Sequence, residues 1–116
     1  MKRRFRLTKS TDYQRVRRLG KSYAHPLIVL IALPNGEPDT HWGMVAGKSV
    51  GGAVQRNRAK RLLRSAGHIV SNQVLKGWDL VLIARQPLIT AEFDQVQSAL
   101  HELLKRAHVM RELKDE

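Results

Sequence analysis

The sequence contains no cysteine and has few acidic or aromatic residues. Of its 116 residues, 10 are Asp or Glu against 21 Lys or Arg, and aromatic residues make up 5%. The absence of cysteine excludes a disulfide framework and a thiolate zinc site, and it agrees with a reducing compartment. The longest apolar run, residues 27–33, is far shorter than the ~18 residues of a membrane-spanning helix. Because the basic start also lacks the apolar stretch of a secretory signal, we expect a cytoplasmic protein.

The positive charge is concentrated in two stretches. Residues 1–21 carry nine basic side chains and one acid, and residues 48–64 carry six basic side chains and no acid. The remaining residues hold six basic against nine acidic side chains, so the total of +11 comes from these two stretches. Such clustering is typical of proteins that bind a polyanion, nucleic acid first. The alternative is a generally basic surface that keeps the protein soluble.

The length and the 42% of apolar residues support one domain with a packed core. Hydrophobic periodicity and turn residues predict three helices and three strands. The first helix is capped by Ser10 or Thr11 and ends near Gly20, the second spans 53–70, and the last is capped by Thr90. The strands are at 27–33, 42–46 and 78–84. The run 27–33 is rich in β-branched residues, which favours a strand covered on both faces. This order predicts an α/β fold, a single-domain α-β sandwich.

The predicted helix at 53–70 has an apolar face and a basic face. The apolar face carries Ala59, Leu62, Leu63, Ala66, Ile69 and Val70, and the opposite face carries Asn57, Lys60, Arg61, Arg64 and His68, flanked by Arg56 and Arg58. No acid lies within the stretch, and like charges one turn apart destabilise a helix by about 0.2–0.5 kcal/mol per pair. A bound polyanion would remove this cost. We therefore interpret the stretch as an RNA-binding surface, with a solvated, salt-bridged helix face as the alternative.

Two short motifs suggest catalysis, but each lacks a required residue. Gly47-Lys48-Ser49 resembles the end of a phosphate-binding loop, whose first glycine would have to replace Trp42. His101-Glu102 on a helix would need a second histidine in place of Lys105 to bind zinc. Local spacing yields no Ser-His-Asp set and no carboxylate pair. The sequence therefore predicts no catalytic residue and no metal ligand in the protein itself.

The basic stretch resembles the signature of the bacterial ribonuclease P protein subunit. The resemblance rests on Arg56-Asn57-Arg58, with Lys48 and Gly51 before it and Lys60-Arg61 and Arg64 after it. It extends to Arg6-Leu7 with residues 12–16, which resemble the family's first helix, and to residues 78–85, which resemble its last strand and the following basic residue. The ordered central motif is specific, because unrelated basic helices rarely carry this arrangement.

The resemblance implies a fold. The family's sandwich has the order α-β-β-β-α-β-α, with a short extra strand near residues 21–24 that periodicity does not reveal. It also implies a left-handed β-α-β crossover around the basic helix, where the general handedness rule predicts the opposite. The expected domain is 1–116, in which residues 1–8 form a basic arm that is free to be flexible and residues 111–116 form a tail.

The resemblance also implies a function. In this family an RNA subunit catalyses the magnesium-dependent hydrolysis that removes the 5′ leader of precursor tRNA, and Mg²⁺ is bound mainly through that RNA. The protein subunit binds the catalytic RNA and holds the leader, with no membrane and no small-molecule substrate involved. Carried over by position, the residues that bind the RNA subunit are Lys48, Arg56, Asn57, Arg58, Lys60, Arg61 and Arg64. Those that bind the leader are Tyr13, Arg17, Val29 and Ile31.

Arg17 and Ile31 stand where the family often has aromatic residues. The leader cleft then relies on charge, aliphatic contact and guanidinium stacking. One alternative function is a structural RNA-binding protein such as a small ribosomal protein, which only the ordered central motif argues against. A basic protein on an anionic membrane is another, but it needs a free apolar face opposite the charges, and the core of a small sandwich requires that face.

We predict that the affinity of this protein for RNA falls steeply with salt, because its basic stretches release counterions from phosphates. Neutralising six to ten phosphates would lower the affinity by roughly 10³–10⁵ between 50 and 200 mM salt. Titrations with the cognate RNA subunit at several salt concentrations give the slope. A nearly flat log–log plot would show that the basic stretches are not the interface.

Overall fold

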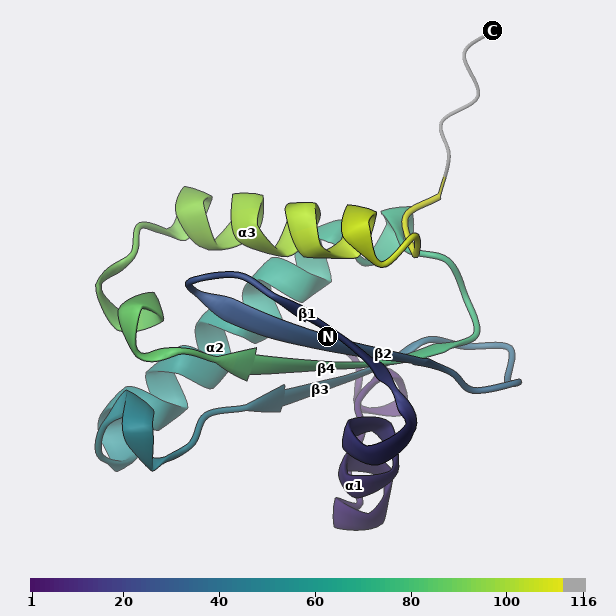
Figure 1. Cartoon of the computed structure of the whole chain (residues 1–116), viewed down its shortest axis with the longest axis horizontal. Coiled ribbons are helices and arrows are strands. Elements are labelled where there is room, and N and C mark those ends of the chain that lie inside the picture. Colours follow the sequence, from purple (N-terminus) through teal and green to yellow (C-terminus); the bar gives the residue numbers. More distant parts are fainter. Residues whose placement is uncertain (112–116) are drawn as a thin grey trace, which may run out of the picture.

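The computed structural model describes residues 1–111, which form one four-stranded sheet flanked by helices (Figure 1). The elements in chain order are α1 (Ser10–Leu19), β1 (Lys21–Ala24), β2 (Ile28–Pro34), β3 (His41–Val45), α2 (Ala53–Val70), β4 (Trp78–Ala84) and α3 (Phe93–Arg106). The predicted order α-β-β-β-α-β-α is confirmed, including the short strand β1. Beyond Arg111, the expected tail lies outside the described residues.

The strand order in the sheet is β1-β2-β4-β3. β1 pairs with β2 and β2 with β4 in antiparallel fashion, whereas β3 and β4 are parallel, with Val45 beside Ile83. α2 joins these parallel strands by the left-handed crossover that the resemblance implied (Figure 1). The handedness depends on which face α2 covers. A right-handed connection would place α2 on the face that α1 occupies and leave Trp42 and Met44 of β3 without cover.

The larger core lies between the sheet and the helices α2 and α3. β2 and β4 send alternate residues into it, so that Leu30 and Leu82 are fully buried against helix residues such as Leu63 and Leu100. The intervening residues of both strands face α1 on the other side of the sheet. β2 is therefore covered on both faces, as its continuous apolar run predicted.

The smaller core holds α1 against the opposite face of the sheet. Val16 is fully buried there between Leu7, Ile31 and Val81. Two glycines permit this close approach. A Cβ atom at Gly43 would lie 2.6 Å from Cε1 of Tyr13, and one at Gly20 would lie 2.5 Å from the Val16 carbonyl oxygen and 2.7 Å from Ile31. α1 thus sits directly on the strands, which fixes the depth of the groove beside it.

Two predicted helix caps are wrong, because other residues begin those helices. α1 begins at Ser10, and the flanking residue is Lys9, with no side-chain cap. Thr90 lies in a 3₁₀ turn, Gln86–Thr90, and α3 is instead capped by Glu92. The Glu92 carboxylate accepts from the Gln95 backbone, and the Gln95 side chain accepts from the Glu92 N–H at 2.8 Å. This reciprocal pair satisfies two first-turn donors, which a single threonine hydroxyl cannot do.

The apolar face of α2 is narrower than predicted. Ala59, Leu63, Ala66 and Val70 are buried against the sheet and α3, whereas Ile69 is 51% exposed. Ile69 precedes Val70 by one residue, which rotates it by about 100° away from the buried line. Small residues on that line bring α2 close to the sheet.

A buried carboxylate, Asp79 at the start of β4, joins four parts of the fold. It accepts from Arg15 of α1 at 2.7 Å and from Asn35 of the β2–β3 loop at 2.9 Å, and it lies 3.0 Å from Nδ1 of His41 in β3. The Asp79 side chain is 3% exposed. Burial raises its pKa, but the hydrogen bonds from Asn35, Arg15 and His41 outweigh burial, and the pKa of Asp79 lies below its ordinary value.

We predict that Asp79→Asn lowers the free energy of unfolding by about 1–3 kcal/mol at neutral pH, because Arg15 loses its buried acceptor charge. The pKa of Asp79 is lower in the folded than in the unfolded protein. The contribution of the carboxylate to the free energy of unfolding is therefore fully present above its ordinary pKa of 3.8 and is lost as the pH falls through its pKa in the folded protein. Denaturant titrations between neutral and acidic pH measure both effects.

Asp39→Asn is the matched control, because Asp39 takes part in no ion pair within residues 1–111. The difference in stability between wild type and Asp79→Asn must shrink below pH 3.8. A difference that stayed constant through this range would show that Asp79 contributes by shape and not by charge.

Candidate nucleic-acid interface

The cations in and before α2 have no acidic partners. None of these six cations forms an ion pair within residues 1–111. They are Lys48, Arg56, Arg58, Lys60, Arg61 and Arg64. The absence of acids noted in the sequence therefore extends to the tertiary structure. The helix keeps its like-charge repulsion, and a bound polyanion is the counterion that would relieve it.

These residues divide between two sides of α2. Asn57, Arg58 and Arg61 are exposed to solvent on the outer side. Arg56, Lys60 and Arg64 are half-buried and recur every four residues along one flank. Arg64 was predicted to point away from the core, but it lines a cavity together with Trp42 and Met44. Its long side chain covers apolar surface while its charge stays near the edge.

The N-terminal arm lies beside that flank. Its 3₁₀ turn, Arg3–Phe5, leads into Arg6, which pairs with Trp42 of β3 as a parallel bridge. The Leu7 N–H donates to the Trp42 carbonyl at 2.8 Å. The arm therefore extends the β3 edge of the sheet and carries its arginines into the space between α1 and α2.

A groove runs between α1 and the end of β3. It encloses about 370 Å³ and is lined by Tyr13, Gln14 and Arg17 of α1, by Val45 of β3, and by Thr8 and Ser10. The Tyr13 hydroxyl donates to the Leu7 carbonyl at 3.1 Å, which fixes the orientation of its ring. Two of the four predicted leader-binding residues, Tyr13 and Arg17, thus line one groove.

The other two lie on the same face of the sheet. Val29 is half-buried beside Ile83 of β4, and Ile83 in turn pairs with Val45. Ile31 is only 7% exposed because α1 covers it. The partly exposed apolar side chains of this sheet face are therefore Val29, Ile83 and Val45 at one end and Leu33 further along β2. Residue alternation in 78–84 was visible in the sequence, but the strand order that brings the first three together was not.

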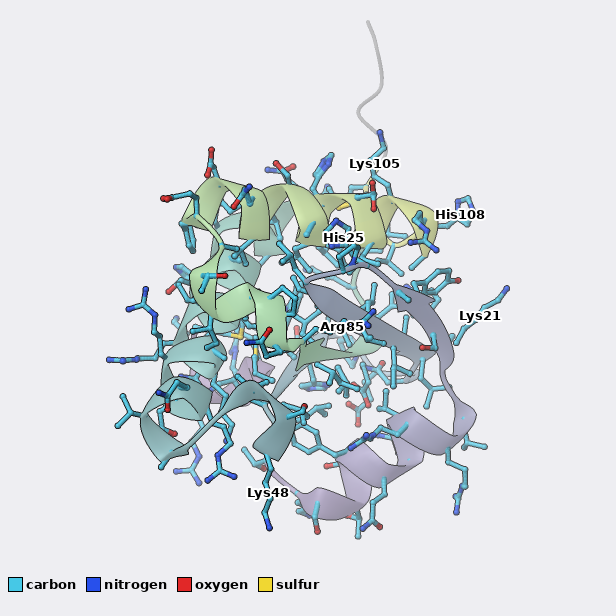
Figure 2. All side chains as sticks on the ribbon, turned by 60° about the vertical axis from the view of Figure 1, so that its left-hand side comes forward. Lys21, His25, Lys48, Arg85, Lys105 and His108 are labelled. Atoms are coloured by element: carbon cyan, nitrogen blue, oxygen red, sulfur yellow. The ribbon has the colours of Figure 1, made fainter. Side chains whose placement is uncertain are left out.

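Lys48 and Arg85 stand at one edge of this face (Figure 2). The parallel strands β3 and β4 end at the same edge of the sheet, and the two cations follow those strand ends. Arg85 also donates to the His25 carbonyl at 3.4 Å, which holds it near the β1–β2 turn. Lys48 was assigned with the α2 cations, and it lies in the 3₁₀ turn Lys48–Val50 that joins β3 to α2, where its side chain points outward into solvent (Figure 2).

The described residues contain no group of three or more His, Asp or Glu side chains that could hold a metal ion. Within residues 1–111, none of the helices is long and apolar enough to cross a membrane. The Asp–His contact found within residues 1–111, between Asp79 and His41, is part of the network that also binds Arg15 and Asn35.

Comparison with known proteins identifies the family. The model of the ribonuclease P family matches residues 1–108. The chain belongs to the ribonuclease P protein family. The ribonuclease P protein component of Herpetosiphon aurantiacus is 40% identical over 109 residues, which cover 94% of this chain and 89% of the relative. That of Roseiflexus castenholzii is 41% identical over 112 residues, which cover 96% and 92%.

Solved ribonuclease P proteins share the fold. The Staphylococcus aureus protein is 30% identical with a TM-score of 0.82, and the match covers 92% of this chain and 98% of that one. A Staphylococcus aureus mutant with defective mRNA degradation activity is also 30% identical, with a TM-score of 0.83 and coverage of 92% and 91%. The Thermotoga maritima protein is 30% identical with a TM-score of 0.79 and coverage of 87% and 96%. This chain is therefore the protein component of ribonuclease P, an endoribonuclease that processes tRNA.

We predict that the purified protein alone does not cleave RNA, because its described residues offer no metal cage and their Asp–His contact is held in a structural network. Incubation of precursor tRNA with protein that is free of the RNA subunit tests this, with the reconstituted complex as the positive control. Cleavage that copurified with the protein and disappeared in the His41→Asn variant would place a catalytic centre in the chain.

Proposed function

We propose that this chain binds the catalytic RNA subunit of ribonuclease P through the cations of α2 and holds the 5′ leader of precursor tRNA between α1 and the sheet. The observation that carries the proposal is the combination of unpaired α2 cations with a separate groove lined by Tyr13 and Arg17. The cytoplasm is the proposed compartment, because it contains both RNAs.

The outer side of α2 suits a folded RNA. Arg58 and Arg61 are exposed and free to form bidentate hydrogen bonds with phosphates. Asn57, on the same outer side of the helix, both donates and accepts, as recognition of a 2′-hydroxyl or a base edge requires. A rigid helix also presents these groups at fixed spacing, so that little conformational freedom is lost when RNA binds.

The groove beside α1 suits an unpaired strand. The Tyr13 ring, already oriented by its hydrogen bond to Leu7, offers a stacking surface for one base. Arg17 at the same groove offers a guanidinium plane and a charge. The apolar surface of Val29, Ile83 and Val45 continues the groove across the sheet, and Lys48 and Arg85 at its edge face the phosphates of a strand laid along it.

We propose that Mg²⁺ acts through the RNA subunit, which supplies the chemistry. The described residues offer no metal site, so the protein acts by position and charge. Its cations reduce repulsion between RNA phosphates, and the holoenzyme should therefore work at lower magnesium than the RNA alone.

We predict that the two surfaces are separable by mutation. Arg58→Ala with Arg61→Ala removes two phosphate partners, so binding to the RNA subunit should weaken and its salt slope should fall by about 2. Tyr13→Leu with Arg17→Ala keeps an apolar side chain against Gly43 but removes the stacking planes. The preference for precursor over mature tRNA should then fall by about 1–3 kcal/mol, the contribution of one stacked base.

Each double variant is titrated twice, once with the RNA subunit and once with precursor against mature tRNA on saturated holoenzyme. Lys105→Ala with Lys76→Ala, which removes two exposed charges outside both surfaces, is the control. Equal weakening of both titrations by both variants would refute two surfaces and favour a diffuse basic coat.

A further inference from the structure

The hydroxyl of Tyr13 links the groove beside α1 to the N-terminal arm. It donates to the Leu7 carbonyl at 3.1 Å. Leu7 belongs to the arm, and its own N–H donates to the Trp42 carbonyl of β3 at 2.8 Å. The preceding residue, Arg6, pairs with Trp42 as a parallel bridge. The ring of Tyr13 is therefore bonded to a segment of the arm that β3 holds in place.

The backbone of β3 supports the same end of the ring. A Cβ atom at Gly43 would lie 2.6 Å from Cε1, 2.9 Å from Cζ and 3.1 Å from the hydroxyl oxygen of Tyr13. Cβ atoms essentially never lie within 3.0 Å of such a neighbour, so the phenol end reaches Leu7 only because residue 43 is glycine. Two separate segments, the arm and β3, thus fix one end of one side chain.

Tyr13 also stands between two cavities. It lines the groove beside α1, and it lines the cavity of about 310 Å³ that lies under the arm. Thr8, the residue after Leu7, lines both as well. The Tyr13 ring is therefore part of the boundary between the groove and the arm, and a movement of the arm at Leu7 would move a wall of the groove.

A ring fixed in advance costs less to bind. An aromatic side chain that is free to rotate must be ordered when a base stacks on it, and this ordering lowers affinity by roughly 2- to 10-fold. Tyr13 is half-buried and held at its phenol end, so its ring is ordered before RNA arrives.

We infer that the Leu7 carbonyl is a positioning group of the leader groove, which acts through the Tyr13 hydroxyl. Docking of the arm on β3 then determines how strongly the groove prefers RNA that carries a leader. Because the bond is shared, the ring in turn stabilises the docked arm. The inference rests on the proposed function, since it concerns the same groove.

Tyr13→Phe tests the hydroxyl, because it keeps the ring and removes the oxygen atom bonded to Leu7. On saturated holoenzyme, we expect the preference for precursor over mature tRNA to fall roughly 2- to 10-fold. In the free chain, we expect faster hydrogen exchange of the Leu7 amide, because the arm loses one of its anchors. A hydroxyl that only stabilised the fold would change the amount of active holoenzyme and not its preference.

Tyr23→Phe is the matched control, because it removes the same atom from the other tyrosine of the chain. Tyr23 lies in β1, where the guanidinium of Arg106 of α3 stands 6.0 Å from its ring centroid. This variant should keep the wild-type preference and the wild-type exchange rate of the Leu7 amide.

Gly43→Ala moves the ring without removing the hydroxyl. The added Cβ atom displaces the phenol end, so the preference for precursor should fall at least as far as in Tyr13→Phe. Gly47→Ala is its control, because a Cβ atom there would meet no other atom within 4 Å. This control should prefer precursor as strongly as the wild type does.

Wild-type preference in Tyr13→Phe or in Gly43→Ala would overturn the inference, and so would a Leu7 exchange rate that Tyr13→Phe left unchanged. The proposed function is tested separately by Tyr13→Leu with Arg17→Ala. If that variant lost the preference while Tyr13→Phe kept it, leader binding in the groove would stand and only the positioning role would be wrong. If neither variant lost it, the proposed leader groove itself would be wrong.

Discussion

The buried carboxylate of Asp79 is the interaction on which the geometry of the functional face depends. It binds Arg15 of α1, Asn35 of the β2–β3 loop and His41 of β3, so one side chain fixes a helix and two strand ends. Glycines at positions 20 and 43 allow α1 to lie directly on the sheet, and the carboxylate holds it there. The groove lined by Tyr13 and Arg17 exists because α1 is held at this depth and angle.

The fold leaves its cations without partners where RNA is expected to bind. Asp79 neutralises Arg15, but the α2 cations and the arginines of the arm form no ion pair among residues 1–111. The arm is anchored to Trp42, and its Arg3 and Arg6 line one cavity with Arg64. The two proposed RNA-binding surfaces therefore adjoin, and the like charge that repels within the free protein is what the proposed contact with RNA would neutralise.

Much of the fold was predictable because its signals are local. The continuous apolar run of β2 predicted a strand covered on both faces, and spacing along residues 53–70 predicted a helix with buried Ala59 and Leu63. The predicted cap at Thr90 was wrong because the capping box of Glu92 and Gln95 begins two residues later and satisfies more donors. Val45 and Ile83 were missed because strand order decides which residues share a face.

The sequence by itself determined where the positive charge lies and which residues share a helix face, since both depend on positions a few residues apart. The ordered motif from Lys48 to Arg64 was sufficient to indicate the family. Only the tertiary structure decided that α1 covers Ile31, that Arg64 and Arg6 line one cavity, and that Asp79 binds Arg15 across 64 positions of the chain. These outcomes depend on contacts between distant segments, because the pairing of β4 between β2 and β3 sets them and no local pattern encodes that pairing.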